Sequence, residues 1–458
     1  MTAVDTSVRP TPGAARAYAF PQFTAHTLPS GLRVVVAPVR KLPLVTVLAL
    51  VDAGSASDAA GQEGVAQLTA SLLTEGTGNL TGAALAEIVE LMGSTLDAGA
   101  DWDSSVVKLT ALTSHLPKAI DVLARVLTEP SLPDDEFQRL RAERLADLLQ
   151  QRSEPRSLAD EAIAQSIYAP GARYAKPDGG SEQSVRAMTL DQVRAFYAAR
   201  YSPHGTTVVL VGDVGTDDGI ALVARVLGNW RGAKASATAS PDAVLPARRA
   251  VHIVRKIDAP QSELRVGHIG PPRLTADYFP LTLCNAILGG LFSSRLNLNL
   301  REEHAYTYGA SSGFDWRRWA GPFSMDAAVQ SDVTALAVQE ILREFARIRS
   351  ERVSDSELSL AQSYLDGVFP IRFETTRAIA SALASQAIYN LPADYYDTYR
   401  ANIRAVSADD ILRVAQQHFD PAKLQVVAVG DTAVISEPLA QLNLGDVTIS
   451  EPVDTLGA

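Results

Sequence analysis

Hydrophobic and polar residues along this chain follow two periods, which separate strands from helices. Three short runs rich in β-branched residues, at 32–37, 45–51 and 105–112, are typical of strands. Longer stretches with apolar residues every three or four positions predict helices. We expect these helices at 64–74, 81–92, 116–128, 134–151, 157–168 and 189–200. Strands and helices that do not strictly alternate indicate an α+β fold, with helices on one face of a mostly antiparallel sheet.

One helix and the strand that follows it occur twice. The first copy spans 189–213 and the second spans 407–431, a constant offset of 218 residues without a gap. Each copy begins with a Ser or Thr N-cap and acidic residues in the first helical turn, and each helix stops before a proline. A β-branched strand ending in Gly-Asp follows. Two copies at this long period predict two similar domains rather than a solenoid.

The boundary between the two domains falls in an unpatterned stretch of small and polar residues at 231–241, which is typical of a surface linker. The sequence therefore predicts a first domain at 1–235, a linker at 236–248 and a second domain at 249–458. A chain of 458 residues with 47% hydrophobic residues is long enough for more than one core, at about 150 residues per domain.

Composition argues against several classes of function. The net charge of −11 comes without a Lys/Arg cluster, so no nucleic-acid partner is expected. The single cysteine, Cys284, cannot form an internal disulfide and suits a reducing compartment. No segment reaches the ~18 consecutive apolar residues of a membrane span, and the first twenty residues lack a signal-peptide pattern. We expect a cytoplasmic protein without a membrane span, or a periplasmic one if a signal peptide was removed.

The segment 64–77 begins with Gly-Val-Ala and ends with Gly-Thr. It resembles the signature helix of the pitrilysin or insulinase family of zinc peptidases, which carries an inverted His-x-x-Glu-His motif between such ends. The resemblance places Gln67 and Ser71 at the histidine positions and Ala70 at the glutamate position. Histidines four residues apart bind Zn²⁺ from one helix face, and the glutamate takes a proton from bound water. The residues present here are not expected to do either.

Two further positions of this family differ in the first half of the chain. Its third zinc ligand is a glutamate on a later helix, and the matching residue is Asp147. One carboxylate without an imidazole makes no ordinary zinc site, so Asp147 is expected to be a solvated helix residue. The family's Asn-Ala before the peptide-pairing strand is Asp97-Ala98 here. Aspartate lacks the amide donor, which leaves peptide binding by strand addition next to the 105–112 strand an open alternative.

The second half contains two blocks that resemble the same family. Residues 287–296 match its L-G-G-x-x-S-S-R-L pattern, and 300–309 match its L-R-E…Y pattern. The first block assigns Gly289 and Gly290 to substrate binding, with an ordinary helix C-cap and turn as the alternative. Further similarity at 28–35 and at 172–177, which resembles the family's His-Pro-Tyr-Gly segment, extends the resemblance over nearly the whole chain.

The second block aligns Arg301 and Tyr308 with an arginine and a tyrosine that, in family members, reach across a central chamber and contact the substrate. A guanidinium group can clamp peptide carbonyls, and a phenol can stabilise an oxyanion. Tyr306 competes for the tyrosine role, and the seven-residue spacing favours Tyr308. The ordinary interpretation is a surface arginine and a core aromatic, just as the 64–74 helix could be a plain core helix.

The resemblance implies a bilobal chain that is the non-catalytic subunit of a two-subunit zinc peptidase. Such a subunit would lend Arg301 and Tyr308 to a heterodimer with a paralogous peptidase subunit, with zinc on that partner and peptides as substrates. No cofactor is expected in this chain itself. The alternative is a stand-alone peptide-binding or structural homodimer without proteolysis, against which the retained Arg301 and Tyr308 argue.

Overall fold

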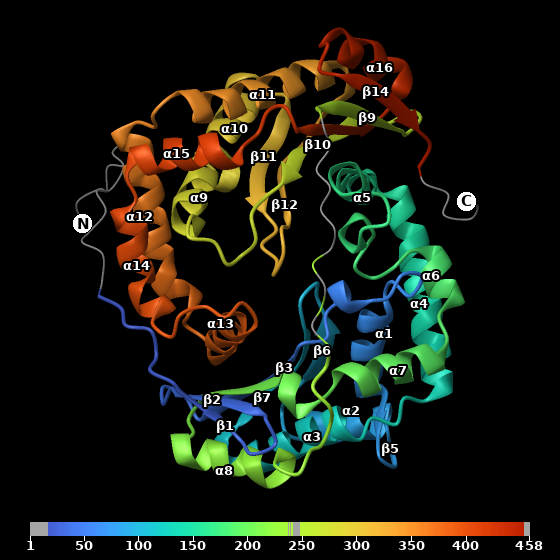
Figure 1. Cartoon of the computed structure of the whole chain (residues 1–458), viewed down its shortest axis with the longest axis vertical. Coiled ribbons are helices and arrows are strands. Elements are labelled where there is room, and N and C mark those ends of the chain that lie inside the picture. Colours follow the sequence, from blue (N-terminus) through green and yellow to red (C-terminus); the bar gives the residue numbers. More distant parts are fainter. Residues whose placement is uncertain (1–16, 237, 239, 241–247, 453–458) are drawn as a thin grey trace, which may run out of the picture.

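The computed structural model describes residues 17–236, 238, 240 and 248–452. Figure 1 shows two lobes, one from each half of the chain, arranged around an open centre. Most of the predicted linker, 236–248, lies outside the described residues. The α+β class predicted from the sequence is confirmed, because each lobe combines one mixed sheet with several helices.

Each lobe contains a six-stranded sheet, and five of the strands follow the same order in both sheets, whereas the sixth precedes those five in the chain of the first sheet and follows them in the second. The first sheet runs β1 (Thr24–Thr27), β2 (Arg33–Pro38), β8 (Thr206–Gly212), β3 (Leu44–Val51), β7 (Ser105–Leu112), β6 (Leu96–Ala100). The second runs β14 (Asp446–Ser450), β9 (Ala250–Arg255), β13 (Gln425–Gly430), β10 (Gln261–Ile269), β12 (Pro322–Gln330), β11 (Thr307–Phe314). The parallel pairs β2–β8 and β9–β13 lie at the same place in both sheets, as the repeated helix–strand unit requires. A short hairpin, β4 (Gly76–Thr77) with β5 (Leu80–Thr81), completes the first lobe.

The six helices predicted in the first half and the repeated helix of the second half are confirmed, with ends that differ by at most a few residues. The other helices were not predicted individually. The first lobe has α1 (Val65–Leu72), α2 (Gly82–Glu90), α3 (Leu116–Thr128), α4 (Asp134–Ser153), α5 (Pro155–Ile167), α6 (Glu182–Ala187), α7 (Leu190–Arg200), α8 (Thr216–Leu227). The second has α9 (Tyr278–Asn285), α10 (Arg295–Asn297), α11 (Thr334–Ser350), α12 (Asp355–Arg372), α13 (Thr376–Ile388), α14 (Tyr395–Ala405), α15 (Ala408–His418), α16 (Thr432–Gln441). None of these described helices is both long and apolar enough to span a membrane.

The repeated helices α7 and α15 start in the same way. The Thr189 and Ser407 side chains each accept a hydrogen bond from a backbone N–H of the first turn, and the third helical residue bonds back to the cap. Such capping boxes satisfy backbone groups that a helix end leaves unpaired. The N-cap signal read from the sequence is therefore confirmed in both copies.

One face of each sheet packs on helices of its own lobe, as expected. In the first lobe, Val34, Val47 and Leu109 from the sheet are fully buried with Leu72 of α1 and Leu123 of α3. Each such side chain contributes about 1.5–3 kcal/mol when it leaves water. This core fixes the position of α1, the helix with the degenerate metal motif.

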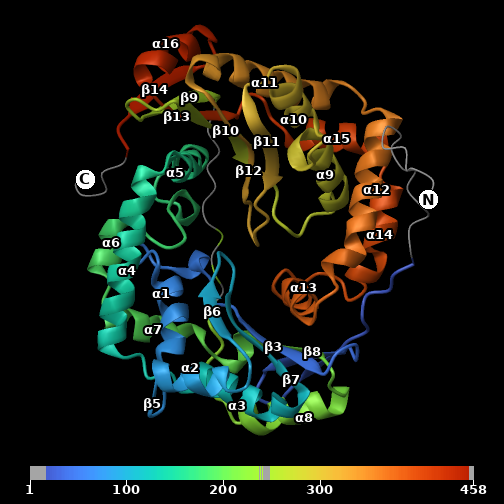
Figure 2. The same cartoon turned by 180° about the vertical axis from the view of Figure 1, so that it is seen from behind.

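The opposite face of each sheet is covered by a helix from the other lobe, which the sequence did not predict. Helix α13 of the second lobe packs on β3 and β8, and α5 of the first lobe packs on β10 and β13 (Figure 2). Ile379 and Leu383 of α13 are buried against Leu48 and Val209. This exchange buries apolar surface on both sides of the junction and joins the two lobes.

Candidate functional site

Helix α1 is held at its N-terminus by a buried carboxylate. The Asp58 side chain accepts hydrogen bonds from the N–H groups of Gly64 (2.8 Å) and Ala66 (3.2 Å) and pairs with Arg173 at 2.9 Å. Burial raises the pKa of Asp58 to about 6, although the Arg173 charge opposes this shift. Because Arg173 belongs to the 172–177 segment, that segment helps to orient α1.

The three motif positions of α1 lie in different surroundings. Ala70 is fully buried in the core, whereas Gln67 and Ser71 are half-buried and line a pocket of about 230 Å³. Asp147 of α4 lines the same pocket. The structure thus brings together the three positions that the family resemblance assigns to metal ligands, and Ala70, at the position of the glutamate, does not line this pocket.

The pocket also holds a cation that the sequence analysis missed. Arg144 lies one turn before Asp147 on α4, and its Nε donates a hydrogen bond to the Gly179 carbonyl at 3.0 Å. A Cβ atom on Gly179 would come within 3.0 Å of both Arg144 Nη2 and Gln67 Oε1, so the ends of both side chains lie close above this glycine. Burial lowers the pKa of Arg144, and the negative charges of Asp178 and Asp147 oppose the shift.

These residues do not fit a zinc ion. Gln67 and Ser71 offer neutral oxygens, and the guanidinium of Arg144 repels a second cation. Glu143, the other carboxylate that lines the pocket, is paired with Arg139 at 2.8 Å. Within the described ranges, no group of three or more His, Cys, Asp or Glu side chains is placed to hold a metal ion.

In the second lobe, Arg301 lies on a π-helical turn, Leu298–Glu303. Its guanidinium carbon is 4.6 Å from the centre of the Phe292 ring, and its Nε is 3.6 Å from Glu302 Oε1. The Phe292 side chain is 71% exposed and Arg301 is only partly buried. A cation stacked on an exposed aromatic ring forms a surface feature suited to contact with another molecule.

Tyr308 lies at the start of the edge strand β11. The pairing of β11 with β12 shifts between Thr307 and Ala310, which marks a bulge at this place. Bulges re-aim side chains, and Tyr308 is 92% exposed. The competing Tyr306 is half-buried against the second lobe's core. Tyr308 is therefore the more exposed of the two tyrosines, and its role toward a substrate remains a prediction.

A buried amide connects the elements that carry Arg301 and Tyr308. Asn297 Nδ2 donates a hydrogen bond to the Phe292 carbonyl at 2.7 Å, and its Oδ1 accepts one from the Ala310 N–H at 3.2 Å. Its side chain thus ties the turn below Arg301 to β11 just after Tyr308. The sequence pattern gave no signal for this role.

Gly289 and Gly290 end another π-helical turn, Ala286–Gly290. A Cβ atom on Gly289 would lie 2.5 Å from the Ser312 backbone nitrogen, and one on Gly290 would lie 2.9 Å from Asn285 Nδ2. The lack of a side chain at both positions is therefore explained by close packing. This is near the alternative interpretation, in which the two glycines only form the end of a helix and a turn. Their contact with a substrate remains a prediction.

Asp97 and Ala98 lie on β6, which ends the first sheet. Asp97 Oδ2 is 3.5 Å from Arg377 Nη1 of α13, and Ala98 packs against the core of the first lobe. Both residues line a shallow pocket of about 260 Å³. The expected place for an added strand, next to 105–112, is taken, because β7 pairs with β3 on one side and with β6 on the other. No described strand pairs with the outer edge of β6, so its backbone groups are open to an added strand instead.

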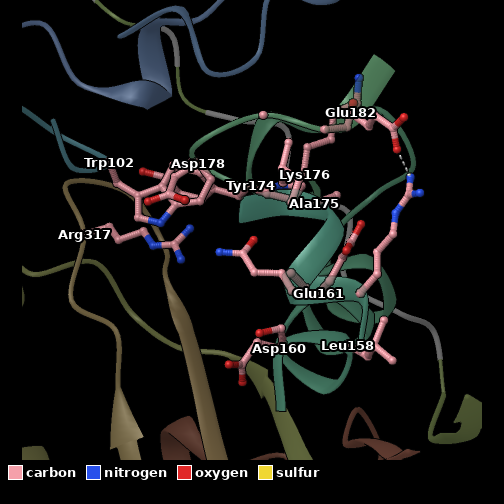
Figure 3. Close-up of a pocket in the computed structure, with 18 residues that line it drawn as sticks. Trp102, Leu158, Asp160, Glu161, Tyr174, Ala175, Lys176, Asp178, Glu182 and Arg317 are labelled. Carbon is pink, nitrogen blue, oxygen red and sulfur yellow. Dashed lines mark ion pairs between the residues drawn. The ribbon is translucent and has the colours of Figure 1, made fainter. Parts of the chain in front are cut away.

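A larger cavity, of about 350 Å³, lies where the first lobe meets Arg317 of the second (Figure 3). Arg317 stacks on Trp102 at 4.1 Å from the ring centre, and Arg173 stacks on the same ring at 4.9 Å. Arg152, which also lines the cavity, pairs with Glu182 at 2.6 Å. The charges around this cavity are therefore largely used in contacts within the protein, and we interpret it as part of the junction between the lobes.

Comparisons with known proteins agree with this geometry. The model of the insulinase family, peptidase family M16, matches residues 33–174, and the model described as peptidase M16 inactive domain matches residues 187–365. The chain is 25% identical to an uncharacterized zinc protease of Mycobacterium leprae, over 78% of this chain and 80% of that protein. It is 24% identical to a non-peptidase homolog of Helicobacter pylori, over 81% and 85%. A solved peptidase M16 inactive domain from Pseudomonas fluorescens has a TM-score of 0.85 at 26% identity, covering 90% of this chain and 99% of that one.

Proposed function

Because this chain belongs to the insulinase family, peptidase family M16, we propose that it is the non-catalytic subunit of a two-subunit zinc peptidase. The matches to an inactive-domain model and to a non-peptidase homolog support a non-catalytic member of the family. In this proposal a paralogous partner chain supplies the zinc, and this chain supplies Arg301 and Tyr308 to a composite site for peptides. The two subunits would act in the cytoplasm, or in the periplasm if a signal peptide is removed.

One observation carries the proposal. Tyr308 is 92% exposed, and the Arg301 guanidinium, seven residues earlier in the chain, is stacked on an exposed ring. An aromatic side chain gains no stability from such a place within the chain, because its apolar surface stays in water. Gln67 in the first lobe, by contrast, is half-buried. This difference supports the binding of another molecule by Arg301 and Tyr308.

The chemistry of the pair suits peptide cleavage on a partner. The Tyr308 hydroxyl would donate a hydrogen bond to the oxygen that becomes negative as the scissile carbonyl is attacked. The Arg301 guanidinium would donate two hydrogen bonds to neighbouring peptide carbonyls and so orient the substrate. Zinc on the partner would supply the activated water. The proposal also places Gly289 and Gly290 near the substrate backbone.

A second candidate is a stand-alone peptide-binding or structural homodimer without proteolysis. The open edge of β6 favours it, because an extended peptide could pair there beside Asp97 and Ala98 with no other subunit present. This candidate assigns no function to Arg301 and Tyr308. Peptide binding that needs β6 and ignores both residues would favour it.

Reconstitution tests the leading proposal. We would co-express this chain with a paralogue that has an intact His-x-x-Glu-His motif, and measure cleavage of a fluorogenic peptide by each chain alone and by the complex. Only the complex should be active, and Arg301→Ala and Tyr308→Phe should reduce that activity. Tyr364→Phe, at a tyrosine that is 51% exposed on α12, is the matched control and should leave it unchanged. Full activity of the partner alone, unaffected by this chain, would refute the composite site.

A further inference from the structure

The guanidinium group of Arg144 places a positive charge in the pocket that is lined by Gln67, Ser71 and Asp147. We propose that Arg144 is the fixed counter-cation of the pocket lined by Gln67, Ser71 and Asp147, and that it keeps divalent metal out even when ligands are restored. This inference concerns the first lobe alone and does not depend on a partner subunit. Under this proposal, the pocket excludes metal for two reasons: its metal ligands are absent, and Arg144 holds a positive charge in their place.

The first step is spatial. Arg144 Nη2 and Gln67 Oε1 crowd the same point above Gly179, since a Cβ atom on that glycine would come within 3.0 Å of each. A histidine nitrogen binds zinc at about 2.0–2.1 Å. A zinc ion held by a side chain at position 67 would therefore lie close to the guanidinium group.

The second step is electrostatic. The pocket's two carboxylates are Glu143, which is paired with Arg139 at 2.8 Å, and Asp147. Arg144 donates a hydrogen bond to the Gly179 carbonyl, which carries no charge. The negative charges that act on its guanidinium group, at longer range, are those of Asp178 and Asp147. Adding a doubly charged ion to this balanced set would place two cations together in a half-buried site, where their repulsion is stronger than in water.

The third step is mechanical. Arg144 joins α4 to Gly179, and the next residue, Gly180, packs on the Glu63 carbonyl just before α1. The Ser184 hydroxyl donates a hydrogen bond to that same carbonyl at 2.9 Å. One guanidinium thus connects α4 to the loop that supports α1, which is the cross-link that a metal ion makes between helices.

The test restores the ligands with and without the arginine. The first variant carries Gln67→His, Ser71→His and Asp147→Glu and keeps Arg144. The second adds Arg144→Leu, and the third adds Arg144→Lys as a charge-preserving control. Ala70 stays unchanged in all three, because zinc binding rather than catalysis is measured and because position 70 is fully buried. Zinc affinity is measured on the full chain by competition with a chromophoric chelator, and folding is checked by circular dichroism.

We expect the Arg144→Leu variant to bind zinc at least about tenfold more tightly than the variant that keeps Arg144, and the Arg144→Lys variant to bind as weakly as the latter. Equal affinity with and without Arg144 would overturn the proposal. The absence of zinc from every folded variant would overturn it too, because something other than Arg144 would then exclude the metal.

A second measurement keeps the proposal testable if the ligand variants fail to fold. In the otherwise unchanged chain, Arg144→Leu and Asp147→Asn are made singly and together, and their thermal unfolding midpoints are compared. If Arg144 balances Asp147, the double variant loses less than the sum of the two single losses. Strictly additive losses would refute the role of Arg144 as the counter-cation.

Discussion

The two lobes share the order of five sheet strands, but their candidate site residues lie in opposite surroundings. In the first lobe, the polar groups around α1 find partners within the chain: Asp58 with Arg173, and Arg144 with Gly179. In the second, Arg301 rests on an exposed phenyl ring and Tyr308 extends into water. The polar groups named in the first lobe are therefore satisfied within the chain, whereas the aromatic side chains named in the second remain exposed to solvent.

The backbone differs between the lobes in the same sense. Helix α1 is regular and capped, whereas the segment between α9 and β11 contains two π-helical turns and leads into a bulge. Such irregularities cost stability and often accompany functional sites, because they point side chains in directions that regular elements do not allow. In the second lobe, the irregular backbone therefore coincides with Arg301 and Tyr308.

The largest expected effect separates the two lobes directly. In the reconstituted complex, Tyr308→Phe should lower kcat/KM about 10²–10³-fold, the usual cost of removing one donor to a developing oxyanion. Arg301→Ala should also lower it, because the substrate carbonyls lose the group that orients them. Gln67→Ala and Ser71→Ala should change it by no more than about twofold, as surface substitutions do. Steady-state cleavage of a fluorogenic peptide measures both. A large loss from the first-lobe variants would abolish the distinction between a closed and an open site.

The cap of α1 predicts a pH dependence that belongs to the first lobe alone. The pKa of Asp58 is raised by burial from 3.8 to about 6, so between these values the folded chain binds more protons than the unfolded chain. The stability that this group contributes is therefore complete below pH 3.8 and is lost as the pH rises through about 6. The loss is about 3 kcal/mol at most.

Asp58→Asn isolates this effect, because asparagine does not titrate. We would measure the free energy of unfolding of both proteins by urea titration from pH 4 to pH 7, and plot wild type minus variant. The difference should fall with rising pH and level off above pH 6. A difference that rises over this range would mean that Arg173 outweighs burial and holds the Asp58 pKa low.

Much of the fold could be predicted because it depends on local signals. The N-caps at Thr189 and Ser407 and the proline that stops each helix fixed the repeat, and two like halves predicted two like sheets. The exchange of α5 and α13 between lobes could not be predicted in this way. Both helices bury apolar residues, and nothing in their periodicity tells which sheet they cover.

The candidate site shows the same limit. The family resemblance singled out Arg301 and Tyr308, and their seven-residue spacing favoured Tyr308 over Tyr306, which the structure shows to be half-buried. The π-helical turn and the edge strand that carry the two residues were not predicted. Arg144 and Asn297 were missed because their roles depend on contacts with Gly179 and Ala310 that only the fold creates. The one available clue to Arg144 was a cation one helical turn from Asp147.

Asn297 allows a smaller change inside the second lobe. Asn297→Leu leaves the Phe292 carbonyl and the Ala310 N–H without their partner, which should cost about 1–3 kcal/mol in the free energy of unfolding. Asn297→Asp keeps an acceptor for Ala310 and should lose less. Urea unfolding measures the cost, and peptide cleavage by the complex should decline in the same order. If cleavage is unaffected while stability falls, Asn297 supports the fold without positioning Arg301 and Tyr308.

The smallest expected effect concerns the ring beneath Arg301. Because Phe292 is 71% exposed, Phe292→Ala should change the free energy of unfolding by less than about 0.5 kcal/mol. The stacked guanidinium, however, loses an interaction of about 0.5–1 kcal/mol, so kcat/KM of the complex should fall about two- to fivefold. Phe292→Trp, which keeps an aromatic face, should restore it. Unchanged cleavage by Phe292→Ala would show that Arg301 is held by its π-helical turn and by Glu302 alone.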